Sequence, residues 1–122
     1  MIEGRFESET NRLFFEIGLI AADGELIFVE ALLDTGFTDW LAINTQDLEI
    51  LNWSSLDDEH LMITAQGEQR FNIYLGNVQI DGQEFNIPVV GGDNIPEILI
   101  GMEWLKSKRL VIDLPAGVMT LG

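Results

Sequence analysis

The sequence has no cysteine, one histidine and only six lysine and arginine residues in a chain of 122. Without cysteine there is no disulfide and no thiolate chemistry, which suits a reducing compartment. The single histidine, His60, lies in an acidic stretch at residues 56–60 that we interpret as a solvated loop. One histidine without spaced partners offers no Ser-His-Asp set and no metal site, and the sequence contains no phosphate-binding loop. We therefore expect neither a metal nor another cofactor.

Basic residues are so few that the 21 acidic residues set a formal net charge of −15. A chain of this charge is repelled by nucleic acid and by anionic membranes, so we expect neither of them as a partner. The simplest interpretation of the charge is a well-solvated acidic surface.

Long apolar runs are absent as well. Residues 1–12 carry no net positive charge, and Glu16 interrupts the apolar stretch at residues 13–22. We therefore expect no signal peptide, no membrane span and a cytoplasmic location. Residues 2–5, Ile-Glu-Gly-Arg, match a protease cleavage sequence that is often built into expressed proteins, but Ile2 and Phe6 also suit a first strand.

Hydrophobic residues make up 47% of the sequence, which is enough for the core of one small domain. Several segments carry local signals of secondary structure. Apolar residues alternate with other residues in segments that predict strands, and Asp-Gly pairs between apolar runs are typical of tight hairpin turns. The strands are expected at residues 15–19, 71–75, 111–114 and 118–121, the turns at 23–24 and 81–82, and short helices from Asn44 to Leu51 and at 102–108.

A weak internal repeat relates the two Asp-Gly turns. Each turn lies between two alternating apolar segments, and each half then ends in an apolar run followed by a glycine, Gly36 in the first half and Gly101 in the second. The expected organisation is a single domain, residues 1–122, in which residues 13–60 and 61–121 are candidates for a two-fold repeat.

The stretch ALLDTGFTDWLAI, residues 31–43, places an acid at the end of an apolar run. Burial of an unpaired carboxylate is costly, so Asp34 needs a reason to be there. Two apolar residues before Asp-Thr-Gly are the signature of aspartic proteases. Two later segments, Thr64-Ala65-Gln66-Gly67 and PVVGGDNIPEILIGMEWL at residues 88–105, follow in that group's order. Over roughly residues 13–121 the chain resembles the retropepsin-like aspartic proteases, above all a prokaryotic branch of them.

The resemblance implies a small all-β, closed-barrel-like fold with one or two short helices, and it implies an endopeptidase. In such enzymes two aspartates share one proton and activate a water, and Asp34 would be one of the two. Gly36 allows a tight turn and offers its N–H to the acid. By resemblance, the Thr35 hydroxyl bonds to the partner's backbone. Taken alone, the triplet also fits an aspartate that caps a turn, with Thr35 and Gly36 as ordinary turn residues.

The chain contains one Asp-Thr-Gly, whereas the reaction needs two aspartates. The second half has Ile98-Leu99-Ile100-Gly101 at the matching place and carries no acid there. A catalytic chain must therefore be a symmetric homodimer with both aspartates at its two-fold axis. The resemblance implies terminal strands that interleave between subunits, for which residues 1–6 and 118–121 are the candidates.

The resemblance also implies a polypeptide substrate under a flap, a hairpin with Thr64, Ala65, Gln66 and Gly67 at its tip. A plain exposed hairpin is the alternative.

Phe37 stands where many members of the family have alanine, and we expect its ring to line the substrate cleft and to narrow or block it. Met102 stands where retroviral enzymes have an arginine that holds the active-site loop. The alternative function is therefore a catalytically silent dimerisation or peptide-binding module.

Overall fold

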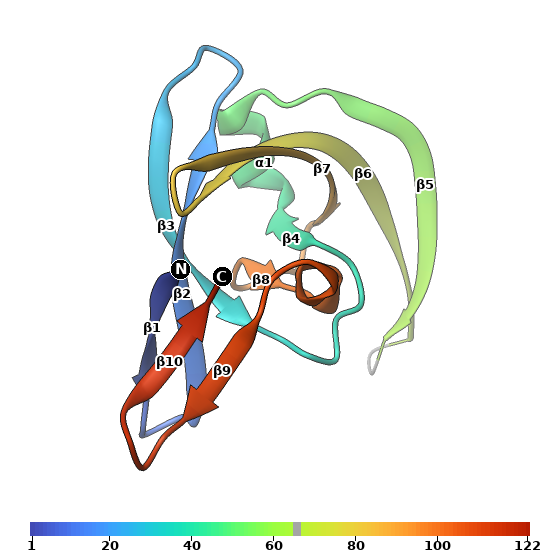
Figure 1. Ribbon diagram of the computed structural model, residues 1–122. Helices are drawn as coiled ribbons and strands as arrows, with labels where there is room; N and C mark the ends of the chain where they lie inside the picture. The colour runs from blue at the N-terminus through green and yellow to red at the C-terminus, as the bar shows by residue number, and fades with distance from the viewer. Residues whose placement is uncertain (65–66) are drawn as a thin grey trace.

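The chain folds as a ring of β-strands with two projecting edges (Figure 1). The structure, a computed structural model, describes the backbone of residues 1–64 and 67–122 and the side chains of residues 1–56 and 71–122. Six strands are hydrogen-bonded in the order β6, β7, β4, β8, β3, β2, and an additional pairing between β2 and β6 closes the ring. The all-β, closed-barrel-like fold expected from the sequence is therefore confirmed.

The elements follow one another along the chain as strands with two short helical segments between them. Their bounds are β1 (Ile2–Glu7), β2 (Arg12–Ile20), β3 (Leu26–Leu33), β4 (Leu41–Asn44), α1 (Thr45–Leu51), β5 (Ser55–Thr64), β6 (Gly67–Ile80), β7 (Gln83–Gly92), β8 (Leu99–Ile100), the 3₁₀ helix η1 (Met102–Lys106), β9 (Leu110–Asp113) and β10 (Val118–Leu121).

The main core is built from the alternating apolar residues of the predicted strands. In β2, Phe15, Ile17 and Leu19 are at most 3% exposed, whereas Glu16 between them is exposed. Trp104 of η1 is fully buried in the same cluster, and its ring packs edge-on against Trp40 and Phe85. No helix among the described residues is both long and apolar enough to span a membrane.

The two Asp-Gly turns differ. Asp81 (φ 54°) and Gly82 (φ 75°) form a two-residue turn between β6 and β7, as the pair predicts. The first pair lies in a wider loop at residues 21–25, which is closed by a hydrogen bond from the Ala21 N–H to the Glu25 carbonyl at 2.9 Å. Of the pair in this loop, only Gly24 has a positive φ.

The first predicted helix is confirmed as α1. As expected for its N-cap, the Asn44 side chain accepts a hydrogen bond from the Gln46 N–H at 2.9 Å. The second, predicted at residues 102–108, is the shorter η1 and ends at Lys106. The interpretation of residues 56–60 as a loop is wrong: they form the first part of β5, with a β-bulge between Leu56 and Glu59.

The two ends of the chain pair with each other. Strand β1 pairs with β2 through residues 4–7 and with β10 through Ile2 and Glu3, and the termini lie close together in Figure 1. Gly4 is required for this packing, since a Cβ there would lie 2.9 Å from the Phe15 ring. Residues 2–5 are therefore an integral strand, and the terminal segments expected to interleave with a partner are paired within one chain.

Candidate active site

Asp34 directly follows β3, at the point where three strands of the ring meet. Strand β3 runs parallel to β8, with Leu33 opposite Ile100, and β8 in turn pairs with β4. The Asp34 N–H donates to the Ile100 carbonyl at 3.0 Å, which extends this pairing by one residue. The backbone of Asp34 is therefore held by the central strands of the ring rather than by a free loop.

The Asp34 carboxylate is held by its own triplet. Its Oδ1 accepts a hydrogen bond from the Gly36 N–H at 2.9 Å, which fixes the orientation of the carboxylate. Asp34 is half-buried, while Thr35 and Gly36 are exposed. The triplet thus presents an oriented carboxylate and an exposed threonine at the molecular surface, where a second molecule can reach them.

The loop after the triplet is held by the segment that follows β8. The Met102 N–H donates to the Phe37 carbonyl at 2.8 Å, and the Gly101 N–H donates to the Trp40 carbonyl at 3.0 Å. The Trp104 indole N–H donates to that same carbonyl at 3.0 Å. Backbone groups and a buried tryptophan therefore hold the loop after the triplet, in a chain that has Met102 where an arginine was the expected anchor.

Gly101 has no room for a side chain. A Cβ at this position would lie 1.9 Å from the Asp39 carbonyl oxygen and 2.8 Å from the Phe37 ring. The absence of a side chain at Gly101 therefore allows the loop after β8 to pack directly against the loop at residues 37–39.

Phe37 points into the protein. It is 9% exposed and packs in a second apolar cluster with Ala42, Val90 and Ile95. Little of the ring is left to narrow a cleft, and a contact of Phe37 with substrate stays a prediction.

The segment expected to form the flap lies at the end of the long β5–β6 hairpin, which arches away from the ring in Figure 1. Thr64 and Gly67 are paired as the last residues of the two strands. Ala65 and Gln66 lie outside the described residues.

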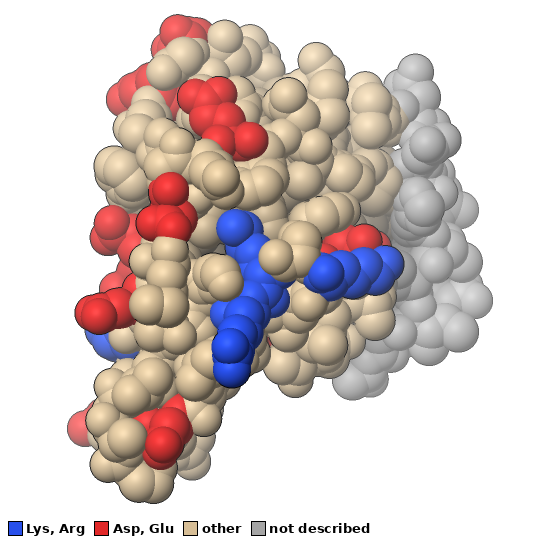
Figure 2. Space-filling view, viewed as in Figure 1, with Lys and Arg blue, Asp and Glu red and all other residues tan. Residues whose placement is uncertain are grey.

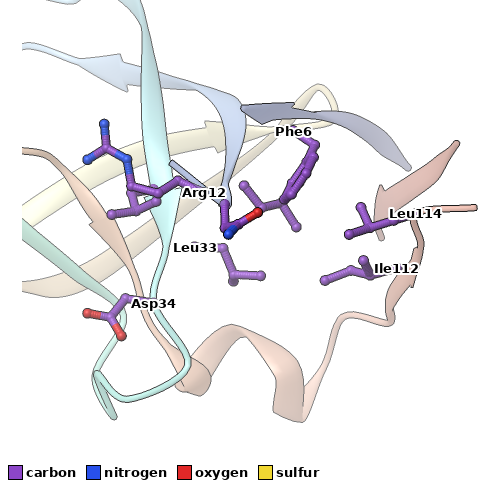
Figure 3. Close-up of a pocket in the computed structure, with 9 residues that line it drawn as sticks. Phe6, Arg12, Leu33, Asp34, Ile112 and Leu114 are labelled. Atoms are coloured by element: carbon purple, nitrogen blue, oxygen red, sulfur yellow. The ribbon is translucent and has the colours of Figure 1, made fainter. Parts of the chain in front are cut away.

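An apolar hollow of about 380 Å³ adjoins Asp34. In Figure 3 the side chains of Leu33, Phe6, Ile112 and Leu114 surround it, and Asp34 lies at its rim. Ile112 and Leu114 are each 45% exposed although they are large and apolar. Asp34 therefore lies beside an apolar surface that the chain does not cover, and in Figure 3 its carboxylate points away from Ile112 and Leu114.

Comparison with known proteins gives matches only among solved structures, since no family model and no curated protein matches the sequence. An EIAV protease complexed with the inhibitor HBY-793 matches with a TM-score of 0.67 at 15% identity, over 88% of this chain and 100% of that one. A retropepsin-like aspartic protease from Rickettsia conorii matches with a TM-score of 0.59 at 23% identity, over 93% and 83%. The protease of Simian Foamy Virus (mac) matches with a TM-score of 0.53 at 20% identity, over 80% and 99%.

The chain has a retropepsin-like fold. Identities between 15% and 23% establish the fold and not the activity. Within this retropepsin-like fold, the structure places Asp34 next to the loop that contains Gly101, since the Asp34 N–H donates to the carbonyl of Ile100. A catalytic role for Asp34 stays a prediction. Among the residues whose side chains are described, no group of three His, Asp or Glu residues could hold a metal ion.

The sequence did not indicate the hollow of the retropepsin-like fold. Its apolar lining comes from segments far apart in the chain, such as Phe6, Leu33 and Ile112. Arg12 also lines it and makes an ion pair with Glu97 at 2.5 Å. The one available signal was the pair of apolar residues Ile112 and Leu114, whose pattern predicts only a closing strand.

Three of the six basic residues lie close together in the sequence just before β9. Lys106, Lys108 and Arg109 lie between the end of η1 and the start of β9. Figure 2 shows blue atoms gathered in the middle of this face, with red atoms mostly away from it. Lys106 pairs with Glu103 at 3.0 Å, and the Lys108 ammonium lies 5.0 Å from the centre of the Phe85 ring. Within the part of the chain whose side chains are described, this strongly acidic protein therefore has a locally basic region at residues 106–109.

Proposed function

We propose that this chain is the subunit of a homodimeric aspartic endopeptidase. The observation that carries the proposal is the Asp34 carboxylate, oriented by the Gly36 N–H at the surface of a retropepsin-like fold. Because the chain supplies one such aspartate, the second is Asp34 of the partner subunit, and the dyad lies on the two-fold axis.

The dyad works by sharing one proton between two carboxylates. Like charges about 3 Å apart do not both ionise, so one Asp34 is protonated and the other is charged. The charged carboxylate takes a proton from a water, the water oxygen bonds to the peptide carbonyl carbon, and the protonated carboxyl donates to the carbonyl oxygen. Transfer of a proton to the amide nitrogen then allows the C–N bond to break, which releases an amine and a carboxylic acid.

Other residues of the site position these two groups. The exposed Thr35 hydroxyl bonds to the partner's backbone and joins the two loops. The tip of the β5–β6 hairpin, with Thr64, Ala65, Gln66 and Gly67, closes over an extended peptide and excludes water. The bound peptide adds backbone hydrogen bonds as an extra strand, so a polypeptide is the substrate.

The test is cleavage of a diverse peptide library between about pH 3.5 and 7.5, read by mass spectrometry, with Asp34→Asn beside the wild type. We expect the variant to lose about 10²-fold to 10⁴-fold in rate, since an amide neither takes nor shares the proton. Asp39→Asn is the matched control, because it makes the same change at an exposed position of the same loop. It should keep its activity.

The outcomes separate the proposal from its alternative. Cuts that persist unchanged in Asp34→Asn contradict the assignment of the dyad. The absence of cuts from a sample shown to be dimeric contradicts the protease and supports a catalytically silent dimerisation or peptide-binding module.

A further inference from the structure

A groove lies between β3 and α1, apart from the candidate active site. It consists of two hollows of about 240 and 270 Å³, and the hollows adjoin because Asp47 and Ile98 line both of them. None of the residues that line this groove also lines the hollow beside Asp34. The smaller hollow is called the apolar end below, and the larger one the acidic end.

The apolar end is open to solvent although most of its lining is apolar. Ile50 of α1 is 74% exposed, and Ile27 and Val29 of β3 are only half-buried. These three side chains line this end together with Leu19 and Leu51. A single exposed isoleucine is common on a protein surface, whereas several apolar side chains around one groove are typical of a binding surface. This end can therefore take an apolar side chain of a second molecule.

Strand β3 borders the groove with a free edge. On the side away from β2 it pairs with β8 only at Leu32 and Leu33, and on that side the Leu32 N–H donates to the Ile98 carbonyl at 2.8 Å. Because backbone groups alternate in direction along a strand, the N–H and C=O groups of Phe28 and Glu30 point to the same side. No described strand pairs with them there. An edge of this kind is a template for an added strand.

Two hydrogen bonds mark the limits of this free edge. At one limit the Ala22 N–H donates to the Leu51 carbonyl at 2.9 Å, which joins the loop before β3 to the end of α1. At the other limit is the pairing of Leu32 with Ile98. Residues 26–31 lie between them, and a strand rises about 3.4 Å per residue, so the free edge is about 17 Å long. That length suits about five residues of extended chain.

The acidic end is lined by three carboxylates, Glu30, Asp47 and Glu97, and by no lysine or arginine. Glu30 is paired with Arg5, and Oε1 of Glu97 is paired with Arg12. The other Glu97 oxygen, Oε2, is buried and has no hydrogen-bond partner among the described residues. Asp47 is exposed and makes no ion pair with a residue whose side chain is described. A lysine or arginine of a second molecule would supply what both groups lack.

We propose that this groove binds an extended segment of a partner polypeptide in which apolar and basic residues alternate. The segment adds a strand to the free edge of β3 and places an apolar side chain against Val29 and Ile50. It places a lysine or arginine beside Asp47 and Glu97. Successive side chains of a strand point to opposite faces, so alternation gives one apolar face and one basic face. The inference goes beyond the proposed function and does not depend on Asp34.

The first test locates the binding site of a probe peptide by NMR. The probe is the acetylated and amidated pentapeptide Lys-Val-Lys-Val-Lys, and the isotopically labelled protein is Asp34→Asn, which excludes loss of the probe by cleavage. The amide signals that shift should be those that border the groove, namely Phe28, Glu30, Asp47 and Ile50. Shifts that are spread evenly over the acidic surface, or that gather around the Asp34 loop, overturn the proposal.

A second peptide controls for charge alone. Lys-Lys-Lys-Val-Val has the same composition and no alternation, and it should bind about fivefold more weakly. Equal affinity of the two peptides overturns the proposal, because attraction to the net charge would then explain the binding.

Single substitutions at the two ends provide matched comparisons. Asp47→Asn should weaken binding of the probe about fivefold, whereas Glu49→Gln, the same change of charge at an exposed residue of α1 outside the groove, should not. Ile50→Gln should also weaken it about fivefold, whereas Leu75→Gln, at a leucine of β6 that is 47% exposed, should not. All four residues are exposed, so the fold should tolerate each change. Equal weakening within either pair overturns the proposal.

The last test addresses the strand edge. N-methylation removes an amide hydrogen, and in an added strand only alternate amides point toward β3. Two probes are therefore compared, one methylated at the central lysine and the other at the valine before it. We expect one of them to bind about tenfold more weakly and the other to keep most of its affinity. Similar binding by both overturns the addition of a strand, and with it the proposal.

Discussion

Asp34 follows apolar residues of a core strand, yet its carboxylate avoids the cost of burial. The strand ends where its apolar residues end, and the acid turns outward to accept from the Gly36 N–H. Gly101 is needed for its lack of a side chain, since it lies where two loops touch and no larger residue fits. At the scale of the residue, the site therefore depends on one oriented charge and one missing side chain.

Gly101→Ala tests the second of these. A Cβ 1.9 Å from the Asp39 carbonyl oxygen forces the backbone to move, and we expect a loss of about 2–4 kcal/mol in the free energy of unfolding. Urea unfolding at one fixed protein concentration measures the loss. Gly82→Ala is the control, because that turn glycine has open space and a φ of 75°, and alanine there should cost only about 1–2 kcal/mol. Equal losses in the two variants would contradict the crowding at Gly101.

At the scale of the element, an ion pair and a hydrogen bond connect side chains of β1 to neighbouring segments. Arg5 of β1 donates to Glu30 of β3 at 2.6 Å, and Glu7 of β1 accepts from the Thr10 hydroxyl at 2.7 Å. The hydrogen bond from Arg5 holds the pKa of Glu30 below its usual 4.5, and the hydrogen bond from Thr10 does the same for the pKa of Glu7. Phe14 of β2 lies beneath, with the Arg5 guanidinium 4.8 Å from the centre of its ring.

These lowered pKa values predict a loss of stability in acid. A carboxylate whose pKa is lower in the folded chain than in the unfolded chain stabilises the fold above the unfolded value. That contribution decreases as the pH falls from about 4.5 through the folded pKa. Arg5→Gln removes the partner of Glu30, so its destabilisation should be larger at pH 7 than at pH 3. Urea unfolding at both pH values checks this, and a destabilisation independent of pH would contradict the role of Glu30.

At the scale of the whole molecule, charge opposes assembly. Each chain carries −15, so a dimer carries twice that, −30. Exposed charges interact over a Debye length of about 10 Å at 0.1 M salt, and the length falls as salt is added. Lys106, Lys108 and Arg109 form a basic segment that locally offsets this negative charge.

Salt should therefore strengthen the dimer. We expect the dissociation constant to fall when salt is raised from about 0.05 M to 0.5 M, because repulsion between the two chains is screened. Sedimentation equilibrium at several salt concentrations measures it. A dissociation constant that rises with salt would show that local ion pairs outweigh the net charge.

The proposed mechanism should favour activity in acid. Since the dyad needs one of its two carboxyl groups protonated, we expect an activity optimum below neutrality. The rate of peptide cleavage as a function of pH measures it, and an optimum above neutrality would contradict the shared proton.

Local signals in the sequence were sufficient for much of the fold. The Asn44 cap, the Asp81-Gly82 turn and the strand around Ile17 formed as predicted, because each depends on residues within a few positions of one another. Residues 56–60 did not, since their acidic composition favours a loop whereas pairing with β6 makes them a strand. A strand that is stabilised by pairing with a distant segment is hard to predict from its own composition.

The candidate site shows the same division. The sequence by itself determined the Asp-Thr-Gly triplet, and it is also the source of the prediction of a second chain, since one triplet supplies one carboxylate. Only the tertiary structure decided that Phe37 is buried, that β1 pairs with β10, and that β9 keeps a free edge beside the hollow. The physical reason is that these outcomes depend on which distant strands compete for the same edge. That competition is decided by the closed ring and not by any one segment of the chain.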